Sequence, residues 1–271
     1  MKTRLISAAI GIVLCITLMI LGEMNSIVIQ VAIALVTALI CGELLSAKGL
    51  HKELVLSIPC IAFGLLMPLL CYTQIRFLPI YLFAVVLFSL LVAFHNKIKV
   101  EDAFFAFGGT LLLTLSMTAF AFTACNPLGH SSFWVVLTLG VPWLADSGAY
   151  FAGVFLGKHK LCPEISPKKT IEGAVGGLIS GALGSVLIGL VFLLIYKDVH
   201  INFLPLIIIG LINPIVSIIG DLAFSVIKRS CGIKDYGSIM PGHGGMLDRF
   251  DSIIFCAPLV FVISNLFTVI S

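Results

Sequence analysis

The sequence predicts an all-α polytopic membrane protein with about nine transmembrane helices, and three observations support this fold class. First, 60% of the 271 residues are hydrophobic and only 11% are charged, whereas a soluble domain carries about 25% charged residues. Second, nine apolar runs each have roughly the length that a helix needs to cross a bilayer. Third, lysine and arginine are concentrated in alternate connecting segments, as the positive-inside rule requires.

The nine apolar runs define the expected helices in order along the chain. None of them shows the two-residue alternation that is typical of a membrane strand. The first run follows Lys2 and Arg4 like a signal peptide, but its length and the absence of a small-residue cleavage site favour a retained span. The expected spans are 5–22, 26–46, 54–74, 77–95, 104–125, 132–157, 173–196, 203–227 and 252–270.

The distribution of positive charge predicts the orientation of these spans. Fourteen of the 16 lysines and arginines lie in segments that alternation places on one side, and only Arg76 and Lys197 lie on the other. The N-terminus is therefore expected in the cytoplasm and the C-terminus outside, in a multi-pass protein of the inner or cell membrane. The polar loops 158–172 and 228–251 then both face the cytoplasm, where nucleotides and Mg²⁺ are available.

Composition also limits the partners and the domain organisation. The net charge of +3 is small and scattered, so we expect no nucleic-acid partner. The eight cysteines form no C-x-x-C pair and mostly lie in apolar runs, which favours structural roles over disulfides or metal binding. Because the polar clusters lie in the second half, we expect four N-terminal membrane spans in 1–100 and a catalytic membrane region in 101–271.

Asp221 lies at the inner end of the eighth apolar run. A carboxylate at that depth is costly and indicates function. Ser225 and Lys228 follow on the same helix face, four and seven residues later. The alternative is a simple Asp221–Lys228 pair that neutralises itself.

Two further carboxylates, Asp248 and Asp251, share the first turn of the last helix if that helix begins near Leu247. Acidic residues also stabilise a helix N-terminus without any ligand. Together with Asp221 they form a set of hard oxygen ligands that suits Mg²⁺. We expect Asp221 and Asp248 to share the metal, with Asp251 as a third or supporting carboxylate; a second cation about 4 Å away would match paired-ion sites. Glu43, near the inner end of the second span, is a further candidate to line the cavity that would hold this metal.

A glycine-rich turn precedes these aspartates. Gly242, Gly244 and Gly245 allow a ligand to approach the backbone closely, and their amides can bind an anion. His243 either contacts phosphate or braces the turn. Positive charge that a polyphosphate needs comes from neighbouring residues: Lys228, Arg229, Lys234 and Arg249.

The second polar cluster begins with Asp146, inside the sixth span, where an acid usually faces a cavity or a partner. The small residues after it favour close helix packing as a structural alternative. Ser166 and Pro167 are typical of a helix start, so we expect Lys168, Lys169 and Thr170 at a helix N-terminus that binds anions. The alternative for these lysines is a positive-inside anchor.

The loop that precedes the last span also carries a motif. Residues 225–251 read S-V-I-K-R, then four further residues, then K-D-Y-G, S-I-M-P and G-H-G-G-M-L-D-R-F-D. This pattern closely resembles the signature of the phosphatidate cytidylyltransferase (CDP-diacylglycerol synthase) family. D-S-G-A-Y and S-P-K-K-T-I-E-G, within 146–173, resemble its second conserved region. Met240 departs from the leucine, isoleucine or phenylalanine usual in the family but keeps bulk and polarity.

The resemblance implies that CTP and phosphatidic acid react to give CDP-diacylglycerol and pyrophosphate, with Mg²⁺ dependence and often a homodimer. The residues by themselves indicate only a cytoplasmic, metal-assisted phosphate site at the bilayer. We assign catalysis to Asp221, Asp248, Asp251, Lys228 and His243. The remaining candidates bind substrate: Asp146, Ser166, Lys168, Lys169, Thr170, Ser225, Arg229, Lys234, Gly242, Gly244, Gly245 and Arg249.

Other functions remain open at this point. One is a CTP-dependent lipid kinase, or a cytidylyltransferase for another lipid phosphate. Another is an ion or anion transporter, which the intramembrane Asp146 and Asp221 would fit, although the sequence shows no paired halves. The D-G-x-x-A-R pattern of CDP-alcohol phosphatidyltransferases is absent from the sequence.

Overall fold

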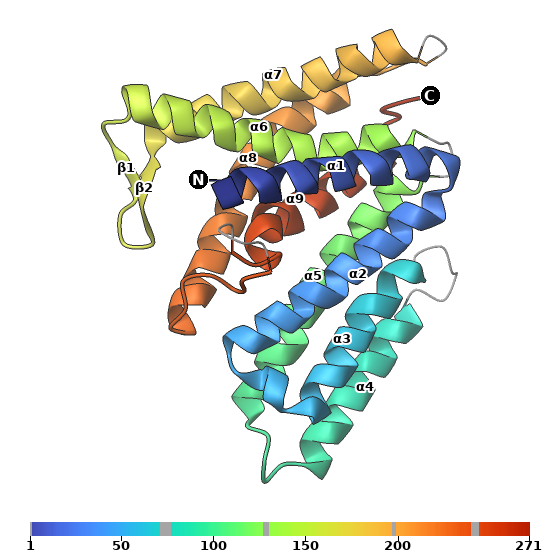
Figure 1. Cartoon of the computed structure of the whole chain (residues 1–271), viewed down its shortest axis with the longest axis vertical. Helices are drawn as coiled ribbons and strands as arrows, with labels where there is room; N and C mark the ends of the chain where they lie inside the picture. Colours follow the sequence, from blue (N-terminus) through green and yellow to red (C-terminus); the bar gives the residue numbers. More distant parts are fainter. Residues whose placement is uncertain (1, 71–76, 127–129, 197–198, 240–243) are drawn as a thin grey trace. The chain divides into compact units, whose positions relative to one another are not determined.

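The computed structural model describes residues 2–70, 77–126, 130–196, 199–239 and 244–271. These residues form nine α-helices, one 3-10 turn and one two-stranded hairpin (Figure 1). Each predicted apolar run coincides with one helix, although the ends differ by a few residues. The runs predict the helices well because the length of an apolar run is a local property of the chain. The helices are α1 (Lys2–Met24), α2 (Ser26–Ala47), α3 (Leu54–Leu69), α4 (Phe77–Ala93), α5 (Val100–Ala124), α6 (Ser131–Leu156), α7 (Ile171–Ile195), α8 (Phe203–Ser230) and α9 (Leu247–Leu266), and the 3-10 turn η1 is Leu50–Lys52.

Five of these helices, α2, α5, α6, α7 and α8, are long and apolar enough to cross a bilayer. The helices α3 and α4 and the segment Val13–Met24 of α1 are apolar but shorter. A multi-pass helical architecture is therefore confirmed, while the count of nine spans and the orientation of the termini remain predictions.

The all-α prediction is wrong in one segment, between α6 and α7. Two short antiparallel strands lie there, β1 (Lys160–Cys162) and β2 (Ser166–Thr170). We expected a helix to begin at Ser166 and Pro167, but the backbone stays extended until Thr170.

Thr170 is the N-cap of α7. Its φ of −124° and ψ of 156° are extended, and its Oγ1 accepts a hydrogen bond from the Gly173 amide at 3.1 Å. Proline disfavours helical geometry in the residue before it, and a threonine hydroxyl is a good cap. The predicted start was therefore too early, and Ser166, Lys168 and Lys169 lie on a strand.

The chain divides into two compact units. The first comprises Met1–Cys125 and Lys228–Phe250, and the second comprises Asn126–Ile227 and Asp251–Ser271. These boundaries differ from the expected functional division at residue 100, which remains a prediction.

In the first unit, α2, α3, α4 and α5 pack around a common apolar core. The rings of Phe63 on α3 and Phe83 on α4 stack with centroids 4.2 Å apart. At one end of α2, Lys48 forms an ion pair of 2.8 Å with Asp102 on α5.

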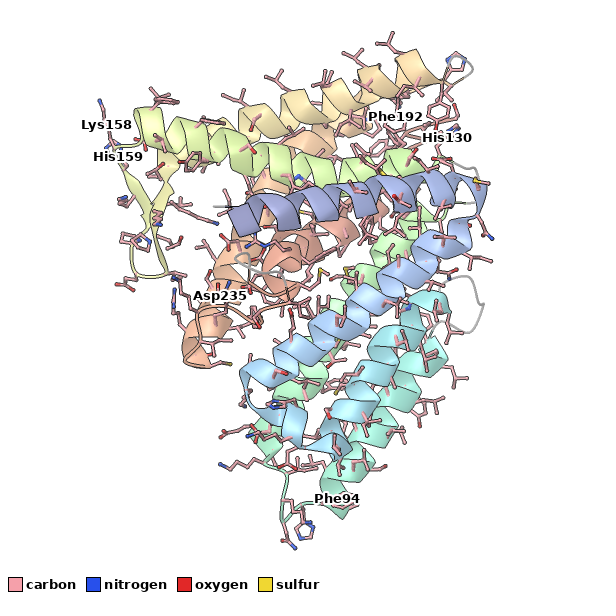
Figure 2. The ribbon with its side chains drawn as sticks, viewed as in Figure 1. Phe94, His130, Lys158, His159, Phe192 and Asp235 are labelled. Atoms are coloured by element: carbon pink, nitrogen blue, oxygen red, sulfur yellow. The ribbon has the colours of Figure 1, made fainter. Side chains whose placement is uncertain are left out.

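In the second unit, α6 and α7 lie side by side along their length, with the hairpin at one end (Figure 1). A Cβ on Gly173 would lie 2.8 Å from the Ala149 carbonyl oxygen, and one on Gly176 would lie 3.0 Å from that of Gly148. A Cβ on Gly148 of α6 would in turn lie 3.1 Å from the Gly176 carbonyl oxygen, so small residues on both helices serve close helix packing. Figure 2 shows His130 and Phe192 at the opposite end of this helix pair from Lys158 and His159.

Candidate active site

A pocket of about 490 Å³ lies at the hairpin end of α6 and α7 in the second unit. This volume is within the range of small-molecule sites. Residues from α6, both strands, α7 and α8 line it. The charged and hydroxyl-bearing residues that line it are Asp146, Tyr150, Lys160, Lys168, Lys169, Thr170 and Asp221.

An ion pair crosses this pocket. Lys169 Nζ lies 2.5 Å from Asp221 Oδ2, and the two side chains are 24% and 34% exposed. Asp146 lines the same pocket from α6. The structure therefore brings together five predicted site residues of the second unit, whereas Ser166 does not line the pocket.

A contact that the sequence did not predict holds the base of the hairpin. Glu172, in the first turn of α7, accepts hydrogen bonds from the His159 amide at 3.2 Å and lies 2.7 Å from His159 Nδ1. The His159 carbonyl accepts from the Ile171 amide at 2.9 Å. His159 lies where α6 leads into the hairpin (Figure 2). The signal for this contact in the sequence is an acidic residue two positions after Thr170, the cap of α7.

The helix α8 ends at a left-handed glycine. Gly232 has a φ of +70°, and its amide donates to the Arg229 carbonyl at 3.0 Å. The Ile233 amide donates to the Lys228 carbonyl, also at 3.0 Å. This hydrogen-bond pattern is a Schellman motif, and it sends the chain into residues 228–248, which we call the Asp248 loop.

Asp248 organises this loop within the first unit. Its Oδ1 accepts from Lys228 Nζ at 2.8 Å, and its Oδ2 accepts from the amides of Tyr236 at 2.8 Å and Gly245 at 3.0 Å. The Lys228 and Asp248 side chains are only 13% and 5% exposed. Lys228 Nζ also lies 5.4 Å from the centroid of the Tyr236 ring. The alternative of a self-neutralising Asp221–Lys228 pair is wrong, since Asp221 pairs with Lys169 and Lys228 pairs with Asp248.

The described part of the glycine turn approaches Asp248 closely. Gly244 has a φ of +87°, and a Cβ there would lie 3.0 Å from Asp248 Oδ2. The expected close approach of this backbone is thus made to a carboxylate of the protein itself. Met240, Gly242 and His243 lie outside the described residues.

Four further predicted residues lie on α8, in the Asp248 loop and on α9. Ser225 is partly buried on α8. The other three, Arg229, Lys234 and Arg249, are basic and exposed.

The helix α9 begins at Leu247, as expected, with Asp248 in its first turn. Asp251 is 9% exposed, and its Oδ1 accepts from the Ser252 amide at 2.8 Å. Asp248 belongs to the first compact unit, and Asp221 and Asp251 belong to the second. Within the described ranges, no three His, Cys, Asp or Glu residues form a metal-binding group. The shared metal site therefore stays a prediction.

Comparison with known proteins gives one consistent result. Residues 2–267 match the family model described as the cytidylyltransferase family. The chain is 32% identical over 271 residues to the phosphatidate cytidylyltransferase of Staphylococcus haemolyticus, covering 97% of this chain and 98% of that protein. It is 44% identical over 128 residues to the enzyme of that name from Bacillus subtilis, covering 47% of this chain and 46% of the relative.

Proposed function

The chain belongs to the cytidylyltransferase family, and we propose that it transfers a cytidylyl group from CTP to phosphatidic acid in phospholipid biosynthesis. The products are CDP-diacylglycerol and pyrophosphate. The observation that carries this proposal within the family is the pocket that Lys168, Lys169, Asp146 and Asp221 line together, with Lys169 paired to Asp221. Such a pocket combines cations for phosphates with carboxylates for a metal ion.

The proposed reaction is one displacement at phosphorus. An oxygen of the phosphatidate phosphate forms a bond to the α-phosphorus of CTP, and the bond from that phosphorus to the bridging oxygen of pyrophosphate breaks. The attacking oxygen is already anionic, so no side chain has to remove a proton from it. The protein contributes positioning and charge neutralisation, which we assign to Lys168, Lys169, Lys228, Arg229 and Arg249.

We propose Mg²⁺ as the cofactor, with Asp221 and Asp248 as its ligands, Asp251 in support, and a second cation beside it. Carboxylate oxygens are the donors that Mg²⁺ prefers, so these residue types fit the ion. When bound, Mg²⁺ stabilises negative charge on the phosphate oxygens. If Asp221 and Asp248 act as one unit, the double Asp→Asn variant is scarcely less active than either single variant; multiplied losses would contradict the assignment.

We further propose nine spans with the N-terminus and both polar loops in the cytoplasm. The positive-inside distribution supports this topology. Cysteine-accessibility labelling at the two termini of a cysteine-free background tests it. Labelling of both termini from the same side would contradict an odd number of spans.

A homodimer is a further proposal, and it rests on the family resemblance. Light scattering of the detergent-solubilised protein, corrected for bound detergent, tests it. A mass of about one 29.0 kDa chain at working concentrations would contradict it.

The decisive experiment for the function is a product analysis. The purified protein is incubated with α-labelled CTP, phosphatidic acid and Mg²⁺, and both the lipid and the aqueous products are identified. Cytidylyl transfer gives labelled CDP-lipid and pyrophosphate, whereas a lipid kinase gives labelled CDP and no labelled lipid. Lipid phosphates other than phosphatidic acid serve as the substrate control.

A further inference from the structure

Glu43 on α2 is a buried acid in an apolar setting. It is 7% exposed, and its neighbours Ile40, Cys41, Leu44 and Leu45 are at most 1% exposed. A buried carboxylate is costly unless hydrogen bonds and opposite charge compensate for the lost water. The partners of Glu43 therefore indicate why an acid is placed here.

Both carboxylate oxygens accept hydrogen bonds from the start of α9. The Met246 amide donates to Oε1 at 2.9 Å, and the Leu247 amide donates to Oε2 at 2.7 Å. Amides at a helix N-terminus lack partners within the helix and carry the positive end of its dipole. Glu43 thus caps a helix that begins more than 200 residues later in the chain. In the part of the chain that the structure describes, no lysine or arginine pairs with Glu43.

Two glycines of the Asp248 loop pack directly against this carboxylate. A Cβ on Gly237 would lie 2.5 Å from Glu43 Oε1, and one on Gly245 would lie 2.6 Å from Oε2. Gly245 also donates its amide to Asp248 Oδ2 at 3.0 Å. Gly245 therefore links Glu43 directly to Asp248.

We propose that Glu43 is a positioning residue for the reaction, which holds the Asp248 loop and the first turn of α9 in their working geometry. It acts through Gly245 and Leu247 and does not touch substrate. The inference rests on the proposed function only in taking Asp248 as part of the catalytic site. It gives the N-terminal helices a specific role in organising the signature loop.

The first test compares Glu43→Gln and Glu43→Asp with the exposed control Glu101→Gln in the same assay. Glutamine keeps the shape but directs an NH₂ group at one of the two amide donors. Because hydrogen bonds to a charged group are at stake, kcat should fall about 10- to 100-fold. The KM for phosphatidic acid should stay constant, and the Mg²⁺ concentration for half-maximal rate should rise. Glu43→Asp keeps the charge and should recover part of the rate, while Glu101→Gln should match the wild type.

The second readout does not depend on catalysis. Lys234 is an exposed trypsin site in the loop, so its cleavage reports how often the loop opens. In detergent-solubilised Glu43→Gln the cut after Lys234 should be about tenfold faster than in the wild type. Unchanged kcat and unchanged cleavage in this variant would overturn the inference while leaving the proposed function intact. A wild-type protein that makes no CDP-lipid would instead refute the proposed function, and the cleavage rates would still decide the role of Glu43.

A further variant covers the case in which Glu43→Gln does not accumulate in the membrane. Gly237→Ala disturbs the same contact from the loop side, since its Cβ displaces the carboxylate. The same joint loss of kcat and of protection from trypsin is expected. A Gly237→Ala protein with the wild-type kcat and cleavage rate would overturn the inference, as would a loss of rate in Glu43→Gln that only follows the amount of folded protein.

Discussion

The Lys169–Asp221 pair and the Lys228–Asp248 pair differ in how far water reaches them. The Lys228 and Asp248 side chains are 13% and 5% exposed. Besides pairing with the lysine, the carboxylate accepts hydrogen bonds from two backbone amides. Lys169 and Asp221 are 24% and 34% exposed and line a pocket of about 490 Å³. The first pair organises a loop, whereas the second faces a space where a ligand fits.

This difference has an energetic consequence. Breaking a buried pair leaves an uncompensated charge, which costs several kcal/mol, but breaking a partly exposed pair costs little because water replaces the lost partner. Changes at Asp248 should therefore affect both stability and activity, while changes at Asp221 should affect activity alone.

The largest effect is expected for Asp248→Asn. The change leaves Lys228 without its counter-charge, so the free energy of unfolding should fall by about 3 kcal/mol. Turnover should fall about 10³-fold, since charge stabilisation is the main catalytic contribution expected here. Thermal unfolding in detergent and the CDP-lipid assay measure the two effects. The control is Asp235→Asn in the same loop, an exposed site (Figure 2) where the melting temperature should not change. An Asp248→Asn protein with wild-type stability would remove the distinction between the two pairs.

Asp221→Asn should lower turnover about 10²- to 10³-fold with less than about 1 kcal/mol of destabilisation. The same two measurements apply to it. This variant sharpens the comparison, because its activity and stability should change independently. Destabilisation equal to that of Asp248→Asn would show that the open pair is also a structural one.

Lys169→Ala should raise the KM for CTP about tenfold, because one charge-assisted contact to phosphate is lost. The KM for phosphatidic acid should remain unchanged. Steady-state kinetics with each substrate varied in turn measure both constants. Lys158→Ala is the matched control, since Lys158 is exposed and does not line the pocket. If only the phosphatidic acid constant shifts, Lys169 binds the lipid head group instead.

The smallest effect is expected for Thr170→Ala. It removes the hydroxyl that caps α7, at a cost of about 1 kcal/mol in stability. Thr170→Ser keeps the cap and should melt close to the wild type, so the pair of variants isolates the hydrogen bond. Equal melting temperatures for the alanine and serine variants would mean that the cap contributes nothing measurable.

Much of the fold was predictable from local sequence features. The nine apolar runs became nine helices in the described residues, since an apolar run longer than a few turns has little alternative in a membrane. The start of α9 near Leu247 also follows from the sequence, because the glycine-rich turn ends at Gly245 and glycine is unfavourable inside a helix. The start of α7 was not, since serine before proline is common both in helix caps and in extended turns, and pairing with β1 decided between them.

The candidate site was predictable in its residue types but not in its partners. The carboxylates, lysines and glycines were recognised from their positions in apolar surroundings. The structure then paired Lys169 with Asp221 and Lys228 with Asp248, rather than Asp221 with Lys228 on one helix face. Helical spacing only places two side chains on the same face, and other elements can offer closer and better-shielded partners.

Local hydrophobicity and sequence motifs thus predicted the family, the nine helices of the described residues, and the residues that we propose to bind phosphate and metal. The ion-pair partners, such as Lys169 with Asp221 and Lys228 with Asp248, depend on how the helices pack. The clearest case is Glu43, an isolated acid in an apolar run whose partners, the Met246 and Leu247 amides, lie more than 200 residues away in the chain. Every residue except proline has a backbone amide, so the sequence does not show which amides will bind Glu43. That contact forms only when the helices pack.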